Sequence, residues 1–239
     1  MNDCWHYVAS TLALCAMLAT SMRLLVADEP IELRRERMVS DQIESRGIRN
    51  PDVLRVMRTT PRHLFVPPKV RSRAYADQPV PIGYGATISQ PYIVALMTEL
   101  LAPSKKHRIL EIGTGSGYQA AILGQLAAQV YTIEIVPALA RSAAKTLRDL
   151  GYANVEVRQG DGCEGWPERA PFDGIILTAA APEVPETLIA QLASHGRLVA
   201  PVGVMWRQEL VVIDKKPDGT IKRWPVCPVL FVPMERSRK

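Results

Sequence analysis

Short apolar runs alternate with helical patterns through the middle of the chain. Arg108–Ile112 is mostly apolar and partly β-branched, which is typical of a buried strand. Three glycines at alternate positions follow, and beyond Gly117 apolar residues recur at helical spacing as far as Ala127. A second strand is predicted at 130–133, directly before Glu134. Strand, glycine turn, helix and strand in this order are typical of a nucleotide-binding βαβ unit.

The same alternation continues towards the C-terminus, with turn residues separating the elements. We predict helices at 137–150 and 186–193, and strands at 155–158, 172–178, 197–203, 209–213 and 221–224. Strands that alternate with helices favour a parallel sheet. The sequence therefore predicts an α/β fold with a doubly wound, Rossmann-like sheet, helices on both faces and an antiparallel C-terminal addition.

The part of the chain before this sheet is predicted to be mainly helical, with interruptions at prolines and glycines. Asn50 precedes a proline, a pairing typical of a helix start. We expect an amphipathic helix at 32–46 that ends at Gly47, a helix from Pro51 capped by Asn50, an extended segment at 61–68 with Phe65 and Val66 packed inward, an irregular segment at 75–85, and a helix after Pro91.

The glycine spacing and two acidic residues indicate the kind of ligand. Gly113–Gly117 is G-x-G-x-G, whereas a dinucleotide pyrophosphate site typically has G-x-G-x-x-G. Glu111, just before the first glycine, would repel a pyrophosphate but could face a cationic group. Glu134 could accept hydrogen bonds from both hydroxyls of a ribose. These features favour S-adenosylmethionine, whose sulfonium and amino groups are positive. A purely structural strand–helix turn is the alternative, and it does not account for both acids.

Other candidate residues follow the remaining parallel strands, and the carboxyl ends of parallel strands share one edge of a sheet. Asp161 and Gly162 follow the strand at 155–158. The Asp161 carboxylate could accept a hydrogen bond from the exocyclic amine of an adenine, or could form only an Asx turn. The small residues at 178–182 follow the next strand. We therefore expect one shared site that also includes Glu111–Gly117 and Glu134.

A serine lies near the start of the helix that precedes the sheet. Ser89 comes two residues before Pro91, in the segment Thr87–Tyr92. Taken alone, a serine in this position is most often a helix cap. The chain has no G-x-S-x-G motif, and no His or Asp is placed to suggest a catalytic triad. Ser89 is therefore not expected to be a conventional acyl-transfer nucleophile.

The composition argues against a nucleic-acid-binding protein and against a metal-binding protein. The 239 residues suffice for one ample α/β domain, with or without an extension, and the net charge of +5 is mild. Basic residues are scattered, apart from 34–35 and the end of the chain, so we predict a solvated surface and no nucleic-acid partner. Cys163 and Cys227 lack paired spacing, and the four histidines are dispersed. We therefore predict no metal site.

The first residues are set apart from the domain by their composition. The apolar run at 8–19 is too short for a confident membrane span, so no stable membrane association is expected for the body of the protein. The run is similar to the apolar region of a secretory signal, but Asp3 lies where positive charge is expected. Translation from a start near Met38 is an equally plain explanation. We favour a cytoplasmic protein, with export as the alternative if residues 1–27 act as a signal peptide.

Several motifs together closely resemble the protein-L-isoaspartate O-methyltransferase family. Leu110–Gln119 carries the glycine loop, which many methyltransferases share, and Thr87–Pro91 is the element specific to the family. The resemblance runs in order from Glu36 to Met234. Further matching segments are Gly160–Gly162, Ala170–Asp173, Pro201–Gly203 and Phe231–Pro233.

The resemblance implies an S-adenosylmethionine-dependent protein carboxyl O-methyltransferase. Such an enzyme transfers a methyl group to the free α-carboxylate of an L-isoaspartyl residue in a damaged protein or peptide, and the ester then collapses to a succinimide. Ser89 matches the residue that the family regards as the active-site residue. The cofactor-binding positions implied are Glu111, Ile112, Gly113, Thr114, Gly115, Ser116, Gly117, Glu134, Asp161 and Gly162.

The substrate side of the site is predicted around the serine and near the C-terminal strands. Backbone amides near Ser89 and the apolar region of Val202 could recognise the substrate main chain, and Gln208 could contribute near cofactor or substrate. The residues predicted on this side are Ile88, Gln90, Pro91, Tyr92, Val202 and Gln208. The implied division is an extension at 1–31 and one domain at 32–239, with a substrate-side part at 32–104, a cofactor-binding core at 105–204 and C-terminal strands at 205–239. A monomer is expected.

Three other functions fit the sequence less well. A small-molecule O-methyltransferase often needs a base or a metal, and the histidines are sparse. A nicotinamide-dependent reductase is disfavoured by the glycine spacing and by the absence of a Tyr-x-x-x-Lys pair. A cofactor-binding module without catalysis would be supported by loss of Ser89 or Glu134, and both are present.

Overall fold

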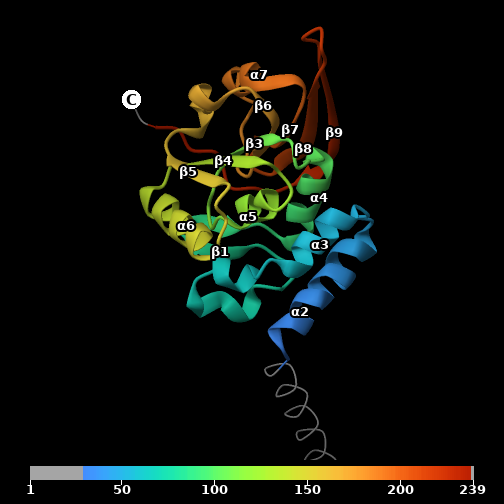
Figure 1. The fold of residues 1–239 in the computed structure, drawn as a ribbon, viewed down its shortest axis with the longest axis vertical. Coiled ribbons are helices and arrows are strands. Elements are labelled where there is room, and N and C mark those ends of the chain that lie inside the picture. Colours follow the sequence, from blue (N-terminus) through green and yellow to red (C-terminus); the bar gives the residue numbers. More distant parts are fainter. Residues whose placement is uncertain (1–28, 238–239) are drawn as a thin grey trace, which may run out of the picture.

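A seven-stranded sheet forms the centre of the protein, as a computed structural model describing residues 29–237 shows (Figure 1). The strand order is β5-β4-β3-β6-β7-β8-β9. The pairs among β3 to β7 are parallel, and β8 and β9 add antiparallel pairs beside β7. The strands are β3 (Arg108–Ile112), β4 (Gln129–Glu134), β5 (Val155–Gln159), β6 (Phe172–Leu177), β7 (Leu192–Val204), β8 (Arg207–Lys215) and β9 (Ile221–Val229). The predicted fold class is therefore confirmed.

The strand order reverses beside β3, which pairs with β4 on one side and with β6 on the other. Ile112, the last residue of β3, is in register with Ile133 of β4 and Leu177 of β6. A crevice opens at such a switch point, outside the carboxyl ends of the strands, because the following connections leave in opposite directions. The fold thus places the glycine loop at the position where open α/β sheets bind ligands.

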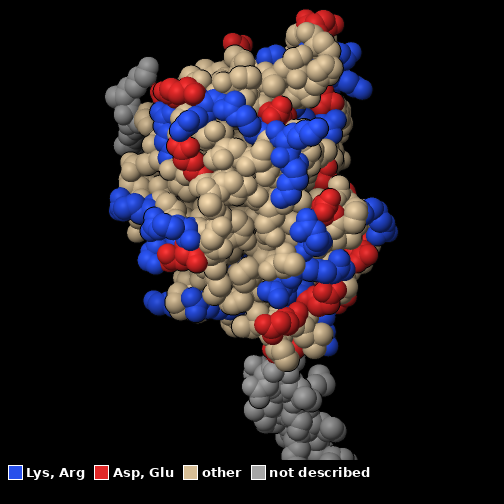
Figure 2. Space-filling model, viewed as in Figure 1, with Lys and Arg blue, Asp and Glu red and all other residues tan. Residues whose placement is uncertain are grey.

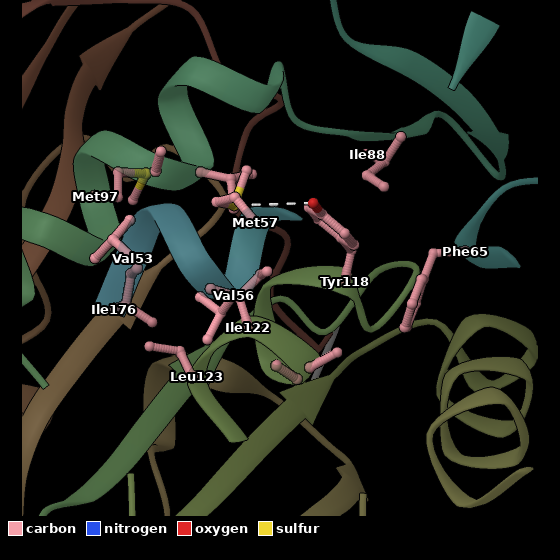
Figure 3. Packing of buried hydrophobic residues seen from close by; sticks show 14 of the residues in the cluster. Val53, Val56, Met57, Phe65, Ile88, Met97, Tyr118, Ile122, Leu123 and Ile176 are labelled. Carbon is pink, nitrogen blue, oxygen red and sulfur yellow. Dashed lines mark hydrogen bonds between the residues drawn. The ribbon is translucent and has the colours of Figure 1, made fainter. Parts of the chain in front are cut away.

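Apolar side chains alternate between two cores, one on each face of the sheet. Ile109 of β3 belongs to the first core and Leu110 to the second. Figure 3 shows the first core, where α3, α4 and α5 meet β6. Helices α3 (Pro51–Thr59), α4 (Pro91–Leu101), α5 (Tyr118–Gly124) and α6 (Pro137–Asp149) contribute to the first core, and α7 (Glu186–Gln191) contributes to the second.

The N-terminal part differs from the sequence prediction in three places. The helix predicted at 32–46 consists of α2 (Ile31–Arg37), a π-helical segment (Met38–Ile43) and a 3-10 turn (Glu44–Arg46), and it ends at Gly47 as predicted. Residues 62–65 form a 3-10 helix, so the prediction of an extended segment was wrong, although Phe65 and Val66 are buried. A further 3-10 helix spans Pro68–Arg73.

The segment predicted to be irregular contains a small antiparallel hairpin of β1 (Val80–Gly83) and β2 (Ala86–Ile88). Tyr84 and Gly85 both have positive φ, as residues in a tight hairpin turn commonly do. The strands are only a few residues long and contain a proline, so hydrophobic periodicity gives little indication of them. This hairpin connects the N-terminal helices to Ser89.

The remaining predicted elements are present with altered ends. Asn50 caps α3, since its side chain accepts hydrogen bonds from the N–H groups of Asp52 and Val53. β7 begins directly after α7, earlier than predicted, and the β8–β9 hairpin projects at the top of Figure 1.

On the face seen in Figure 2, basic and acidic residues are interspersed around a central uncharged area. Between residues 29 and 237, no helix is long and apolar enough to cross a bilayer. The N-terminal segment at 1–28 lies outside the described residues.

Candidate active site

The glycine loop packs closely against the end of β6. Gly113, Gly115 and Gly117 all have positive φ, which side chains disfavour. A Cβ atom added to Gly113 would overlap the Oγ1 atom of Thr178. Thr178 Oγ1 donates hydrogen bonds to the carbonyl oxygens of Ile112 and Gly113. Glycine is therefore needed at position 113 both for backbone conformation and for the contact between loop and sheet.

The carboxylate of Glu134 is held at the end of β4 by backbone groups. Its Oε2 atom accepts a hydrogen bond of 2.8 Å from the N–H of Gly115, and Oε1 accepts one of 2.9 Å from the N–H of Val136. Each oxygen keeps further acceptor capacity. The glycine loop and the acid therefore fix each other, and the carboxylate can still accept hydrogen bonds from a ligand.

Glu111 on β3 is fully buried, and only one of its oxygens is paired. Thr132 donates a hydrogen bond to Oε2, and Thr114 is bonded to the same threonine. Oε1 has no partner within residues 29–237. Burial is the main reason that the pKa of Glu111 is raised to about 8; the hydrogen bond from Thr132 opposes this rise, and the nearby charge of Glu134 adds to it. An unpaired buried carboxyl group of this kind is suited to meeting a cation.

These groups line a cavity at the carboxyl ends of β3, β4 and β6, with about 1080 Å³ of space when its open mouth is included. All predicted cofactor-binding residues except Gly117 and Asp161 lie in its wall. Gly117 precedes α5 and packs against Leu147 and Ala143 of α6 instead. The structure thus brings most of the predicted cofactor residues together around one space.

A second cavity adjoins the first and is lined partly by the segment after β9. The two cavities share four wall residues, Thr87, Ser89, Thr178 and Val232. Of the predicted substrate-side residues, Ile88 lines the first cavity and Gln90 lines the second. Ser89 therefore lies where the two cavities adjoin.

Ser89 does not cap a helix, which was the common alternative for a serine in its position. The N-cap of α4 is Gln90, and no side chain caps this helix. The backbone of Ser89 is instead held by Arg62, whose Nη2 atom donates a hydrogen bond of 2.6 Å to the Ser89 carbonyl oxygen. The half-buried side chain contributes to both cavity walls. The hydroxyl of Ser89 is thus not committed to the helix.

Four of the predicted substrate-side residues line neither cavity. Pro91 begins α4, and the guanidinium of Arg46 lies 5.1 Å from the ring centroid of Tyr92. Val202 is buried in the second core. The Gln208 side chain bonds the backbone of Met205 and of Phe231. These four positions support the walls rather than form them.

Asp161 also lies outside the cavity wall, although Gly162 is part of it. The Asp161 carboxylate accepts hydrogen bonds from the N–H groups of Cys163 and Ser237, so it forms the turn that sequence offered as its alternative role. Burial opposes its ionisation, but these bonds lower the pKa of Asp161 below its usual value. Its acceptor capacity is therefore largely used within the protein.

Sequence reasoning missed two parts of the cavity wall. One is the β1–β2 hairpin, through Tyr84, Gly85 and Ala86. The other is the C-terminal segment Val232–Glu235, which is held beside the sheet by hydrogen bonds between the backbone of Ala180 and that of Val232 and Met234. Neither segment shows hydrophobic periodicity, and only the short family match at Phe231–Pro233 indicated the C-terminal segment. Within the described part of the chain, no three His, Cys, Asp or Glu side chains gather as metal ligands.

Comparison with known proteins identifies the family. Residues 33–239 match the family model described as "Protein-L-isoaspartate(D-aspartate) O-methyltransferase (PCMT)". The chain is 54% identical over 215 residues to a protein-L-isoaspartate O-methyltransferase of Synechococcus sp. (strain JA-2-3B'a(2-13)), covering 87% of this chain and 88% of that protein. It is 56% identical over 201 residues to one of Methanoregula boonei, covering 84% and 92%.

A solved structure agrees with these relatives. A Plasmodium falciparum protein described as a protein-L-isoaspartate O-methyltransferase, in complex with S-adenosyl-L-homocysteine, superposes with a TM-score of 0.74. The identity is 25%, and the match covers 85% of this chain and 99% of that one. The sequence match spans nearly the whole described domain, and the fold and cavity agree with it. The chain therefore belongs to the protein-L-isoaspartate(D-aspartate) O-methyltransferase family.

Proposed function

We propose that the two adjoining cavities divide the two substrates of this protein-L-isoaspartate O-methyltransferase between them. The first cavity binds S-adenosylmethionine, the second receives the isoaspartyl residue, and the reacting groups meet at Ser89. The observation that carries this proposal is that Ser89 contributes to the walls of both cavities. Thr178 is also shared by the two walls.

The residues that line the first cavity are chemically suited to S-adenosylmethionine. Glu111 offers an unpaired buried oxygen to a positive group, and Glu134 is oriented to accept from ribose hydroxyls. The loop Gly113–Gly117 allows close approach of backbone. Gly162 lines the cavity where we place the adenine, with Asp161 fixing the turn around it. When bound, the cofactor supplies a methyl group on a positive sulfur.

The protein's own residues have little acid–base work to do in this reaction. The α-carboxylate of an isoaspartyl residue is ionised at neutral pH and is already a nucleophile, so no general base is required. The site needs to align the carboxylate and to exclude water. We assign the first task to the Ser89 hydroxyl, as a hydrogen-bond donor to one carboxylate oxygen. Backbone groups of Ile88 and Gln90 beside it are assigned to the substrate main chain.

The substrates are isoaspartyl proteins and peptides. We further propose that the enzyme acts as a monomer in the cytoplasm, where S-adenosylmethionine is made, and that residues 1–31 are an extension to the domain at 32–239. The family match beginning at residue 33 supports that boundary. The mass of the mature chain, measured separately in cytoplasmic and exported fractions, would distinguish a retained extension from a cleaved signal.

The test of the site is methyl transfer from labelled S-adenosylmethionine to paired peptides that differ only in isoaspartate or aspartate. We expect base-labile label on the isoaspartyl peptide alone. Ser89→Ala should lose most of this labelling, whereas Ser72→Ala, at an exposed serine, should keep it. Label on both peptides would contradict the substrate assignment, and full labelling by Ser89→Ala would contradict the place of Ser89 at the substrate.

A further inference from the structure

An exposed apolar turn lies between β7 and β8. Val204, Met205 and Trp206 expose 56%, 74% and 80% of their surfaces. Met205 adopts a positive φ of 48°, a conformation that few residues other than glycine adopt. Single exposed apolar residues are ordinary, but three consecutive ones that include a tryptophan mark an interaction site. We call residues Val204–Arg207 the apolar turn.

The apolar turn is fastened to the wall of the second cavity by one side chain. Gln208 is buried, and its Nε2 atom donates hydrogen bonds to the carbonyl oxygens of Met205 at 3.0 Å and Phe231 at 3.1 Å. Its Oε1 atom accepts a hydrogen bond of 2.7 Å from the N–H of Phe231. Phe231 lines the second cavity. A three-bond amide clamp therefore holds the turn at a fixed position beside that cavity.

The apolar surface continues from the turn to the cavity itself. Strand register places Gln208 opposite Gly203 and Val229, so the turn lies next to the end of β9. Leu230, the residue after β9, lines the second cavity and exposes 62% of its surface. Val232 also lines the cavity and is partly exposed. The turn and these residues form one apolar rim along a side of the cavity.

We propose that the apolar turn, together with Leu230, binds the polypeptide that flanks the isoaspartyl residue of the substrate. This inference rests on the proposed role of the second cavity. A polypeptide whose isoaspartyl side is inside the cavity must leave across its rim, and an apolar rim favours apolar or aromatic neighbours. Such neighbours are exposed in unfolded or damaged chains. The rim therefore selects substrates by the residues around the damaged position.

The test compares two isoaspartyl peptides of equal length, one with apolar and aromatic flanking residues and one with glycine and serine. In Trp206→Ser we expect KM for the apolar peptide to rise about tenfold, because a buried aromatic contact is lost. KM for the glycine–serine peptide should change less than about twofold, with kcat unchanged for both. Leu33→Ala, at another exposed apolar residue, is the control and should change neither value.

Equal changes in KM for both peptides, or no change for either, would overturn the proposal. An apolar surface can also be covered by a second copy of the protein, and sedimentation of the wild-type protein tests this alternative. A dimer that Trp206→Ser converts to a monomer would also overturn it, because the turn would then be covered by a second copy. Failure of the underlying site assignment is distinguishable, since Ser89→Ala would then leave kcat unchanged for both isoaspartyl peptides.

Discussion

The guanidinium of Arg62 holds the backbone of Ser89 from inside the protein. Its Nη2 atom donates a hydrogen bond of 2.6 Å to the carbonyl oxygen of Ser89, and its Nε atom donates one of 2.7 Å to that of Ala74. The side chain is fully buried, and its guanidinium lies 4.8 Å from the ring centroid of Tyr118. Burial lowers the pKa of Arg62 to about 10, so the group is still charged at neutral pH. A buried cation thus fixes the position of the proposed active-site serine.

Substituting Arg62 should therefore affect both stability and turnover. In Arg62→Lys the positive charge remains, but the planar fork that reaches two carbonyl groups is lost. We expect the free energy of unfolding to fall by about 2–4 kcal/mol, since a buried acceptor is left unpaired. Under conditions where the variant is folded, kcat should fall while cofactor affinity is retained. Chemical denaturation and steady-state kinetics measure these effects.

Arg55→Lys is the matched control for this substitution. Arg55 is exposed and pairs with Asp52, one turn away on the same helix. Its replacement should change the free energy of unfolding by less than about 0.5 kcal/mol. If Arg62→Lys behaved like this control, Arg62 would not be the group that positions Ser89.

The central strands of the parallel core could be predicted from sequence because they are buried on both faces. Such strands are mostly apolar, and Arg108–Ile112 is one of them. The edge strand β5 is only partly buried. The glycine loop was predictable because its conformation and close packing require glycine. The corresponding site residues follow directly from these two features.

The rest of the site depends on contacts between distant parts of the chain. Arg62 and Ser89 are 27 positions apart, and Val232 reaches the cavity through a backbone hydrogen bond to Ala180. Backbone pairing of this kind leaves no pattern in side-chain type. Asp161 shows the opposite problem, because a carboxylate at a strand end suits a ligand and a local turn equally well.

Glu111 should make the stability of the free protein depend on pH. Its folded pKa of about 8 is raised above the ordinary value of 4.5, so the folded state keeps a proton that the unfolded state loses. The unfolding free energy should therefore fall as the pH rises from about 5 to about 8, and level off above the folded pKa. Thermal or chemical denaturation of wild-type protein and Glu111→Gln, compared across this range, isolates the contribution, because only the wild type has this titration.

The same group should make cofactor binding depend on pH in the opposite sense. A positive ligand group interacts better with the ionised form of Glu111, so affinity for S-adenosylmethionine should rise as the pH increases towards 8. Calorimetric titration at several pH values measures this slope. In Glu111→Gln, the affinity should be lower and nearly independent of pH over that range. An equal slope in both proteins would show that another group is responsible.

Replacing Gly113 by alanine should disrupt the glycine loop. The added Cβ overlaps Thr178 Oγ1, and the residue has a φ of +94°. We expect the free energy of unfolding to fall by more than about 2 kcal/mol, with a large loss of cofactor affinity. Gly219→Ala is the control, because Gly219 also has a positive φ, of +83°, but an added Cβ meets nothing within 4 Å. The control should lose only about 1 kcal/mol, from backbone strain, and an equal loss in both variants would exclude steric overlap as the cause.

Replacing Ser89 by alanine tests the role of its hydroxyl in aligning the substrate carboxylate. The residue does not cap α4, and its backbone is held by Arg62, so the fold should tolerate the change. We expect kcat to fall about tenfold to a hundredfold, since one hydrogen bond to a charged group contributes about 1.5–3 kcal/mol. The dissociation constant for S-adenosylmethionine should change less than about threefold, because Glu111 and Glu134 remain in place. Ser89→Thr keeps the hydroxyl and should retain more turnover than the alanine variant. Unchanged kcat in Ser89→Ala, measured with saturating isoaspartyl peptide, would remove Ser89 from the reaction and leave alignment to the backbone of the cavity.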